Sequence, residues 1–339
     1  MKKYETKVLK ASEESVKLAG ELIRSGEIVG IPTETVYGLG GNALESTSSK
    51  KIFEAKGRPS DNPLIVHITE IDEVTPLVRD FPYLAKKCAE KFWPGPLTMV
   101  LPKSDLIPFE TSGGLDTVGI RMPSDSTARA IIKAAGVPVA APSANLSGSP
   151  SPTEAVHVFN DMNGRIPLII DGNNSAVGVE STVISFENNA IRVLRPGFVS
   201  PEDLTEITPN VIIDDGVINM LSKDAVVKSP GMKYKHYSPD ADIVIIDGAL
   251  DKYIEYIKNN ASESDCCMVF DGDELDVKNP IITYGRDSEE QAALLFSTLR
   301  KLDFMGIKKV YARCPSKDGV GLAVYNRLLR AAGFKVIRV

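Results

Sequence analysis

The chain has 339 residues, a length that favours two domains over one or three. Its composition, 43% hydrophobic and 25% charged with a mean hydropathy near zero, is typical of a globular protein and excludes a chain that is mainly disordered. No apolar run reaches the ~20 residues that a membrane-spanning helix needs, and residues 1–5 lead into a charged segment without a signal-peptide core. We therefore expect a cytoplasmic protein.

The net charge of −6 at pH 7 argues against a protein whose main activity is non-specific nucleic-acid binding, because such proteins usually carry a basic excess. The charge is unevenly distributed along the chain. Residues 223–236 carry four lysines against one aspartate, whereas the segments on either side are acidic. A short basic stretch therefore interrupts an acidic chain.

The cysteines form no CxxC pair, since Cys266 and Cys267 are adjacent while Cys88 and Cys314 are isolated. The three histidines are scattered along the sequence as well. This pattern predicts buried free thiols, and neither a disulfide framework nor a zinc site.

Helical and strand patterns alternate irregularly over residues 1–222. Helical periodicity is found at 12–25, 46–55, 82–91, 127–135 and 152–163. Strand patterns are found at 28–32, 64–67, 98–101, 117–121, 137–141, 168–171, 181–186 and 190–195. Because several strands follow one another without an intervening helix, we expect an α/β domain built on a mixed, strongly twisted sheet.

Residues 223–240 contain two Ser-Pro pairs and a Pro-Gly turn, without a helix or strand period, and are predicted to be a linker. Its lysines, together with Tyr234 and His236, make it a candidate for lying over an anionic ligand. An inert, solvated spacer is the alternative.

Strands and helices alternate regularly after this linker. Strand patterns lie at 242–247, 266–270, 281–284, 309–312 and 335–339, and helical patterns at 250–259, 288–302 and 321–332. Alternation of this kind predicts βαβ units and a smaller, Rossmann-like parallel α/β domain. The expected organisation is a domain at 1–222, a basic linker at 223–240 and a C-terminal domain at 241–339.

Two stretches near the N-terminus combine strand ends with chemically active side chains. Residues 32–40 read PTETVYGLG and place hydroxyls and a carboxylate at the end of a strand, where open α/β sheets usually bind ligands. Residues 56–63 read KGRPSDNP, with two cations on either side of a glycine, a pattern that suits a phosphate or carboxylate. A plain turn and a solvated charged loop are the alternatives.

Two further stretches follow the same logic. Residues 113–123 include a predicted strand that carries Thr117 and Arg121 on one face. Residues 141–148 read APSANLSG, a strand end followed by small polar residues that turn chemistry alone could also explain. The sequence has no GxxxxGK[ST] phosphate loop, no GxGxxG between a strand and a helix, and no GxSxG elbow. A nucleotide would therefore have to be held by dispersed cations and hydroxyls.

Together these stretches resemble the YrdC-like family, whose active cleft carries Lys-x-Arg followed downstream by Ser-x-Asn. This signature stands here as Lys56, Arg58, Ser143 and Asn145. The runs FWPGPLT, GVEST and RPG match as well, and SPGMKYKHYSP and GLAVYNRLLRAA extend the likeness to the longer family architecture with an appended C-terminal domain. The resemblance implies that residues 1–222 form a YrdC-like catalytic domain.

The resemblance also implies an activity, L-threonylcarbamoyladenylate synthase. This nucleotidyltransferase condenses L-threonine, bicarbonate or carbon dioxide, and ATP to threonylcarbamoyl-AMP and pyrophosphate. In the family, a separate transferase complex uses the product to make the threonylcarbamoyladenosine of tRNA. Charge compensation in the transition state would come from Lys56, Arg58 and Mg²⁺ carried on the ATP phosphates, with no dedicated protein ligands for the metal and no protein nucleophile.

The family analogy assigns the remaining roles. Lys56, Arg58, Ser143 and Asn145 are expected to be catalytic. L-threonine would be held by Thr35, His67, Arg121 and Ser181. ATP would be held by Arg58, Asn62, Thr117, Ala141, Ser143, Ser151, Arg195 and, from the linker, Tyr234.

Two other functions are open at this point. One is a double-stranded RNA or tRNA-binding module of the same fold, which the acidic balance of residues 1–222 disfavours. The other is the sibling reaction of carbamoyl adenylation, whose enzymes carry zinc-finger-like and acylphosphatase regions. This chain has neither the cysteines nor the length for those regions.

Overall fold

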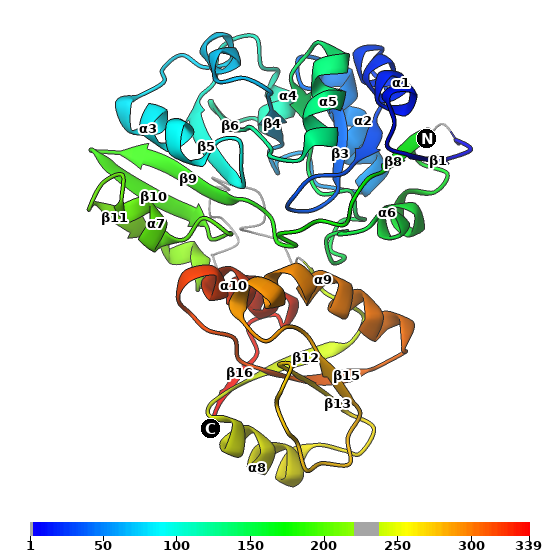
Figure 1. The fold of residues 1–339 in the computed structure, drawn as a ribbon, viewed down its shortest axis with the longest axis vertical. Coiled ribbons are helices and arrows are strands. Elements are labelled where there is room, and N and C mark those ends of the chain that lie inside the picture. The colour runs from blue at the N-terminus through cyan, green and yellow to red at the C-terminus, as the bar shows by residue number, and fades with distance from the viewer. Residues whose placement is uncertain (1–2, 220–236) are drawn as a thin grey trace. The chain divides into compact units, whose positions relative to one another are not determined.

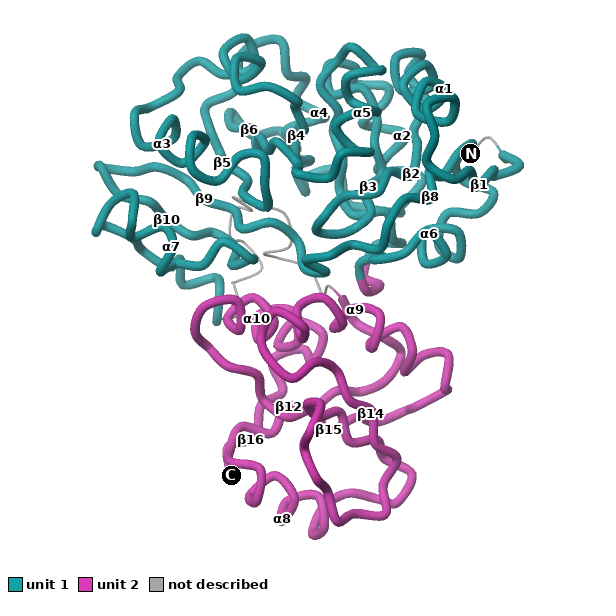
Figure 2. The backbone as a smooth tube through the Cα atoms, in the orientation of Figure 1, with its two compact units in different colours: residues 1–147, 151–233 teal, residues 148–150, 234–339 magenta. Residues whose placement is uncertain are grey.

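The computed structural model describes residues 3–219 and 237–339, which divide into two compact units (Figure 2). The described part of the larger unit is 3–147 and 151–219, and that of the smaller unit is 148–150 and 237–339. Most of the predicted linker, including Tyr234, lies outside the described residues. No described helix is both long enough and apolar enough to cross a membrane.

The larger unit is built on a twisted sheet whose described strands run in the order β1-β8-β2-β3-β7-β4-β6-β5-β9-β10-β11 (Figure 1). Its strands are β1 (Lys7–Lys10), β2 (Val29–Ile31), β3 (Gly38–Asn42), β4 (Ile65–His67), β5 (Leu97–Pro102), β6 (Thr117–Arg121), β7 (Val139–Ala140), β8 (Leu168–Asp171), β9 (Thr182–Glu187), β10 (Ala190–Arg195) and β11 (Val211–Ile213). Parallel pairs such as β4 with β6 alternate with antiparallel pairs such as β5 with β6. The sheet is therefore mixed, as predicted.

Short helices cover this sheet. They are α1 (Glu13–Arg24), α2 (Ser46–Lys56), the 3₁₀ turn η1 (Ile71–Leu77), α3 (Tyr83–Phe92), α4 (Phe109–Ser112), α5 (Ser126–Ala135), α6 (Ala155–Met162), α7 (Pro201–Thr205) and the 3₁₀ turn η2 (Asp215–Val217). The helices that the sequence predicted all form, although α6 begins three residues later than its pattern suggested. Strands β1 and β11 were not predicted because their residues are mostly exposed, and helices α4 and α7 because each is short.

Strand β3 is the main departure from the sequence prediction. Its sequence GLGGN has low β-propensity because glycine brings no side chain to pack. Each of its five residues is nevertheless buried, and a Cβ on Gly40 or Gly41 would lie 3.1 Å from a side-chain atom of Val139 or Ile28. Its glycines thus let β3 pack closely against these neighbours. The strand brings the end of the PTETVYGLG stretch into the sheet.

Helices α1 and α5 pack against each other over one end of the sheet. The hydroxyl of Ser12 accepts a hydrogen bond from the backbone N–H of Ser15, and the carboxylate of Asp125 accepts one from Ala128, so both helices begin at capped N-termini. At the contact, a Cβ on Gly20 would lie 2.6 Å from the backbone carbon of Ala134. Glycine is therefore required for the two helix backbones to approach this closely.

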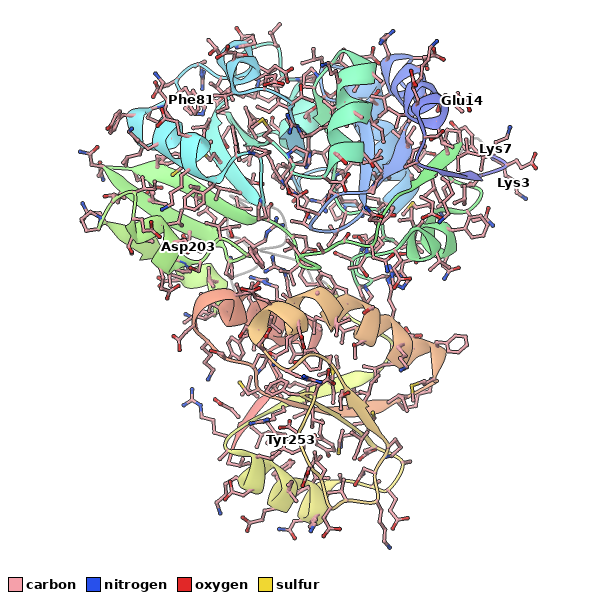
Figure 3. All side chains as sticks on the ribbon, in the orientation of Figure 1. Lys3, Lys7, Glu14, Phe81, Asp203 and Tyr253 are labelled. Atoms are coloured by element: carbon pink, nitrogen blue, oxygen red, sulfur yellow. The ribbon has the colours of Figure 1, made fainter. Side chains whose placement is uncertain are left out.

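The smaller unit is an all-parallel sheet of order β14-β13-β15-β12-β16. Its elements are β12 (Asp242–Asp247), α8 (Leu250–Asn260), β13 (Cys266–Val269), β14 (Ile281–Thr283), α9 (Ser288–Phe304), β15 (Lys309–Arg313), α10 (Gly319–Ala331) and β16 (Val336–Arg338). Helix α8 covers one face, on which Tyr253 donates a hydrogen bond to the carbonyl of Tyr311, and α9 and α10 cover the other (Figures 1 and 3). The unit is the predicted smaller, parallel α/β domain, but β15 lies between β13 and β12, so its strand order differs from the Rossmann order, in which the first two strands are neighbours.

Replacing Gly20 by alanine tests the close contact between α1 and α5. Alanine favours a helix by up to ~1 kcal/mol over glycine, yet we expect Gly20→Ala to lower the free energy of unfolding by about 1–3 kcal/mol because the added methyl group meets the backbone of α5. Urea denaturation measures this change. The matched control, Glu21→Ala on the exposed side of α1, should stay within ~0.5 kcal/mol of the parent. A stabilised Gly20→Ala variant would contradict the tight contact.

Candidate active site

The register of the central strands gathers several predicted site residues on one face of the sheet. His67 on β4 lies opposite Arg121 on β6, and Arg121 lies opposite Thr98 on β5. Thr98 in turn lies opposite Val183 on β9, two residues after Ser181. Because paired residues of neighbouring strands point to the same side, these side chains form one continuous row.

The loop after β2 supplies the other half of this site. Arg121 donates a hydrogen bond from Nη1 to the hydroxyl of Thr35 at 2.8 Å, and its Nη2 lies 2.7 Å from Oε1 of Glu34. The hydroxyls of Thr35 and Thr33 lie 3.0 Å apart, and the Thr33 hydroxyl donates to the carbonyl of Val36. Since Thr33 uses its proton on that carbonyl, Thr35 donates to Thr33 while it accepts from Arg121. This chain of hydrogen bonds fixes the guanidinium group.

Glu34 and Arg121 form a buried ion pair, with side chains only 9% and 5% exposed. Burial raises the pKa of Glu34, but the charge and hydrogen bonding of Arg121 and the backbone N–H of Ser124 outweigh it, and the pKa lies below its usual range. Glu34 is therefore ionised. Oε2 of Glu34 and Nε of Arg121 are buried without a hydrogen-bond partner among the described residues.

His67 is buried beside this pair. Its pKa is lowered to about 3, first by burial and then by the positive charge of Arg121. Its Nδ1 lies 3.1 Å from the carbonyl of Ile65, and backbone hydrogen bonds with Ile65 and Val139 oppose the lowering of its pKa without outweighing burial. The site therefore combines one cation, one anion and a neutral imidazole.

Ser181 and Arg195 extend the row beyond β5. The hydroxyl of Ser181 lies 2.8 Å from that of Thr98, and Arg195 donates from Nε and Nη2 to the carbonyl of Ser181 at 3.1 and 3.0 Å. A β-bulge between Val193 and Arg195 turns the Arg195 side chain to this face. The predicted threonine residue Ser181 and the predicted ATP residue Arg195 are thus in direct contact.

The family signature residues lie together at the ends of α2 and β7. Lys56 is 2% exposed, and its ammonium group donates to the carbonyls of Ser143 and Asn145 and to the Asn145 side-chain oxygen. Ser143 forms a β-bridge with Gly38 at the start of β3. Lys56 therefore ties the loop after β7 to the end of α2, and β3 joins this loop to the sheet.

Arg58 and Asn62 lie on the loop that follows α2. Arg58 donates from Nε and Nη2 to the carbonyls of Asn62 and Pro63, both at 3.2 Å. Asn62 is 1% exposed, and its Oδ1 has no hydrogen-bond partner among the residues that the structure describes. Arg58 shapes the loop, and Asn62 keeps one buried acceptor for a ligand.

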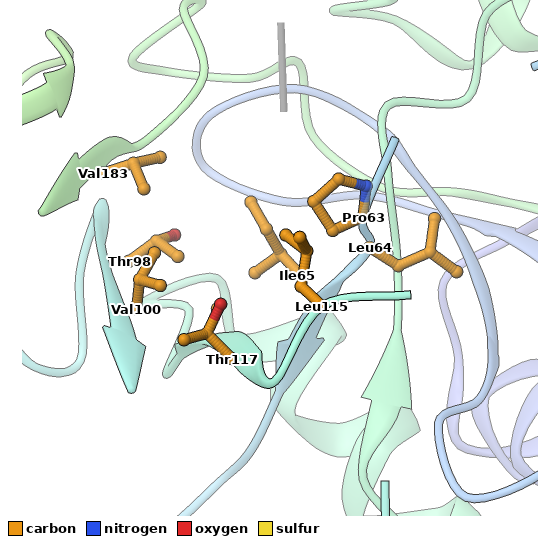
Figure 4. A pocket seen from close by; sticks show the side chains of 9 residues that line it. Pro63, Leu64, Ile65, Thr98, Val100, Leu115, Thr117 and Val183 are labelled. Carbon is orange, nitrogen blue, oxygen red and sulfur yellow. The ribbon is translucent and has the colours of Figure 1, made fainter. Parts of the chain in front are cut away.

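The other predicted ATP residues are spread around these groups. Thr117 lines a hollow of about 270 Å³, open solvent included, on the face that carries Thr98 (Figure 4). The backbone N–H of Ala141 donates to the carbonyl of Ile65 at 2.9 Å, and the buried hydroxyl of Ser151 donates to the carboxylate of Glu180.

Sequence reasoning missed Glu34, Thr98 and Glu180 as site residues. All three stand in stretches that the sequence analysis had singled out, PTETVYGLG, FWPGPLT and GVEST. Only the pairing of the strands and the contact with Arg121 show that Thr98 and Glu34 face the site. Among the described residues, no group of three or more His, Cys, Asp or Glu side chains is arranged to hold a metal ion.

The buried, neutral His67 should make folding sensitive to acid. Between pH 6.5 and about 3 the unfolded chain binds a proton at this residue that the folded chain excludes, so stability falls as the pH falls, by up to ~1.4 kcal/mol per pH unit. Nuclear magnetic resonance of the imidazole should show no titration above pH 4. A midpoint near 6.5 for His67 in the folded protein would refute its neutral, buried state.

Lys56→Met should destabilise the protein by about 1–3 kcal/mol, because it leaves the carbonyls of Ser143 and Asn145 without their donor. Thermal and urea unfolding measure the effect. Lys50→Met, on the exposed side of the same helix, is the matched control and should change stability by less than ~0.5 kcal/mol. Equal effects of the two substitutions would mean that Lys56 does not hold the loop.

Comparisons with known proteins identify relatives over almost the whole chain. Residues 21–197 match a family model described as "Telomere recombination", of the Sua5, YciO and YrdC group, and residues 199–333 match one described as "Threonylcarbamoyl-AMP synthase, C-terminal domain". The chain is 43% identical to the threonylcarbamoyl-AMP synthase of Pyrococcus abyssi, with 96% of each chain covered. It is 42% identical to that of Bacillus subtilis, with 98% of this chain and 97% of the relative covered.

Solved structures agree with these matches. A double variant of Sua5 from Pyrococcus abyssi superposes with a TM-score of 0.92 at 41% identity, and the same protein complexed with L-threonine with a TM-score of 0.89 at 40% identity. In both comparisons, 98% of each chain is covered. With both family models matched and full-length relatives above 40% identity, the chain belongs to the threonylcarbamoyl-AMP synthase family, of the architecture that carries the Sua5 C-terminal domain.

Proposed function

We propose that the protein is an L-threonylcarbamoyladenylate synthase, a nucleotidyltransferase that converts L-threonine, bicarbonate and ATP to threonylcarbamoyl-AMP, pyrophosphate and water. The observation that carries the proposal is the buried Arg121, fixed by Glu34 and Thr35, on the sheet face next to the Lys56 signature. A carboxylate ligand suits a guanidinium group held in this way. The relative from Pyrococcus abyssi that was solved with L-threonine supports the same substrate.

The chemistry requires no nucleophile from the protein. Carboxylation of the threonine amine gives an N-carboxylate, and this oxyanion attacks the α-phosphate of ATP and displaces pyrophosphate. The protein's contribution is to hold the two substrates side by side and to balance negative charge, which suits a site built from cations and hydroxyls. Positioning of two reactants can lower the barrier by roughly 7–11 kcal/mol.

Threonine would occupy the row formed by Thr35, His67, Arg121 and Ser181. Arg121 would bind the carboxylate of threonine through Nε, a donor that has no hydrogen-bond partner among the described residues. The neutral His67 adds no charge, so Arg121 would supply the positive charge for the carboxylate in this row, with Glu34 as its existing counter-ion. Contact between Ser181 and Arg195 places this row next to the ATP side.

ATP would lie along the outer part of the same face. Asn62 offers a buried oxygen acceptor, and Thr117 lines the adjoining hollow, so both suit the polar groups of a nucleotide. Arg58 and Arg195 would balance the phosphates. Lys56 would stabilise the phosphates through its positive charge, without a direct hydrogen bond. Its three N–H groups already donate to the loop that carries Ser143 and Asn145.

Mg²⁺ would arrive with the ATP phosphates and neutralise part of their charge, without a dedicated set of protein ligands. Use of the product by a tRNA-modifying transferase complex and a direct contact with tRNA remain predictions from the sequence resemblance, and a cytoplasmic location remains one from the sequence pattern. The alternative of a double-stranded RNA or tRNA-binding module also stays a prediction, and the expected ATP contact of Tyr234 falls outside the described residues.

Pyrophosphate release tests the proposal. The purified protein should release pyrophosphate from ATP only when L-threonine, bicarbonate and Mg²⁺ are all present, as measured by a coupled pyrophosphatase assay. Arg121→Met should lower kcat/KM for threonine at least ~30-fold, because it removes one member of a buried charged pair. Arg79→Met, at an exposed arginine, is the control and should behave as the parent. Release that is indifferent to threonine would disprove the proposed reaction.

A further inference from the structure

We infer that Glu34 binds the α-ammonium group of the amino-acid substrate, and that the Glu34–Arg121 pair thereby selects a zwitterion. The inference rests on the proposed function and adds a residue to it, because the roles predicted from the family resemblance do not include Glu34. The ammonium group of the substrate would contact Glu34, and its carboxylate would contact Arg121, so both members of one buried ion pair would bind the substrate.

The geometry of Glu34 leaves one oxygen for a ligand. Oε1 lies 2.7 Å from Nη2 of Arg121 and accepts a hydrogen bond from the backbone N–H of Ser124 at 3.1 Å. Oε2 is buried and has no partner among the described residues. A buried carboxylate oxygen without a donor is costly, by about 1–3 kcal/mol or more for a charged group, so a ligand donor at this position would recover that free energy.

Glu34 is also the carboxylate best placed to do this. Asp125 uses its carboxylate to cap α5 at the N–H of Ala128, and Glu180 accepts from the hydroxyl of Ser151. Glu34 contacts the guanidinium group to which the substrate carboxylate is assigned. An α-amino acid carries its ammonium and carboxylate groups on one carbon, and Oε2 of Glu34 and Nε of Arg121 are both buried, without a described partner, on the two members of one ion pair.

Charge balance supports a zwitterion. The ion pair is neutral as a whole, and His67 beside it is uncharged. Asp125, whose charge also acts on Glu34, already accepts a hydrogen bond from the N-terminus of α5. A zwitterionic amino acid adds no net charge to this buried region, whereas the corresponding hydroxy acid would add one unpaired negative charge next to Glu34. Uncompensated charge is strongly disfavoured in a site with this little solvent. The ion pair should therefore reject the hydroxy acid.

Carboxylation of the substrate nitrogen would then reverse the sign of its electrostatic interaction with Glu34. The substrate ammonium group first releases a proton to solvent, and the free amine then condenses with bicarbonate to form the N–C bond and water. The attraction to Glu34 thereby turns into repulsion between two anions. Glu34 would direct the new oxyanion away from itself and toward the cations that are assigned to ATP.

Calorimetric titration of the full chain tests the inference with two probes, L-threonine and the stereochemically matched 2,3-dihydroxybutanoate, in which a hydroxyl replaces the amine. The parent should bind threonine about 10- to 100-fold more tightly than the hydroxy acid, the range expected for a hydrogen bond between charged groups. Glu34→Gln should weaken the binding of threonine by a similar factor. The affinity for the hydroxy acid should stay unchanged or increase, because the Glu34 carboxylate no longer competes for Arg121. Glu21→Gln, a carboxylate-to-amide change on the exposed side of α1, should alter neither affinity.

The outcomes separate this inference from the proposed function. If Glu34→Gln lowers the affinity for both probes equally, or for neither, the role of Glu34 is merely structural. This result overturns the inference while the threonine site stands. A parent that binds both probes equally overturns it as well, and this comparison needs no variant, so it is decisive even if Glu34→Gln does not fold. A parent that fails to bind threonine overturns the proposed function, and the inference with it.

Discussion

The buried contact of Arg121 with Glu34 and Thr35 is the interaction on which the candidate site depends. An arginine that is almost fully enclosed needs a counter-charge and hydrogen-bond acceptors, and the loop after β2 supplies both. The same contact joins a strand in the middle of the sheet to the loop of the PTETVYGLG stretch. The proposed recognition of the substrate and the local fold of this region therefore share the same atoms.

Much of the fold could be predicted from the sequence because the longer elements carry clear periodicity. The smaller unit was predicted strand by strand, since its central strands β12, β13 and β15 are mainly buried runs and turn residues or a helix separate each strand from the next. Strand β3 could not be predicted in this way, because its glycines have low β-propensity and are needed for close packing rather than for pairing. The strand order of the larger sheet could not be predicted either, since contacts between residues distant in the sequence determine it.

Prediction of the site named segments that lie close together in the fold, but not the contacts within them. The sequence pointed to Lys56 as a cation for the phosphates, whereas in the fold its ammonium group binds the carbonyls of Ser143 and Asn145. The sequence also drew attention to a carboxylate in the PTETVYGLG stretch without a partner for it. Only the folded chain shows that Glu34 meets Arg121, which lies 87 positions further along the chain.

The register between β5 and β6 also limits how the sequence of this enzyme can change. Side chains of a strand alternate between the two faces of a sheet, so deletion of one residue within β6 would move Arg121 to the opposite face and replace it with a neighbour. Loops of the larger unit can change in length without this consequence. Insertions and deletions in relatives of this protein should therefore accumulate between the central strands and be absent inside them.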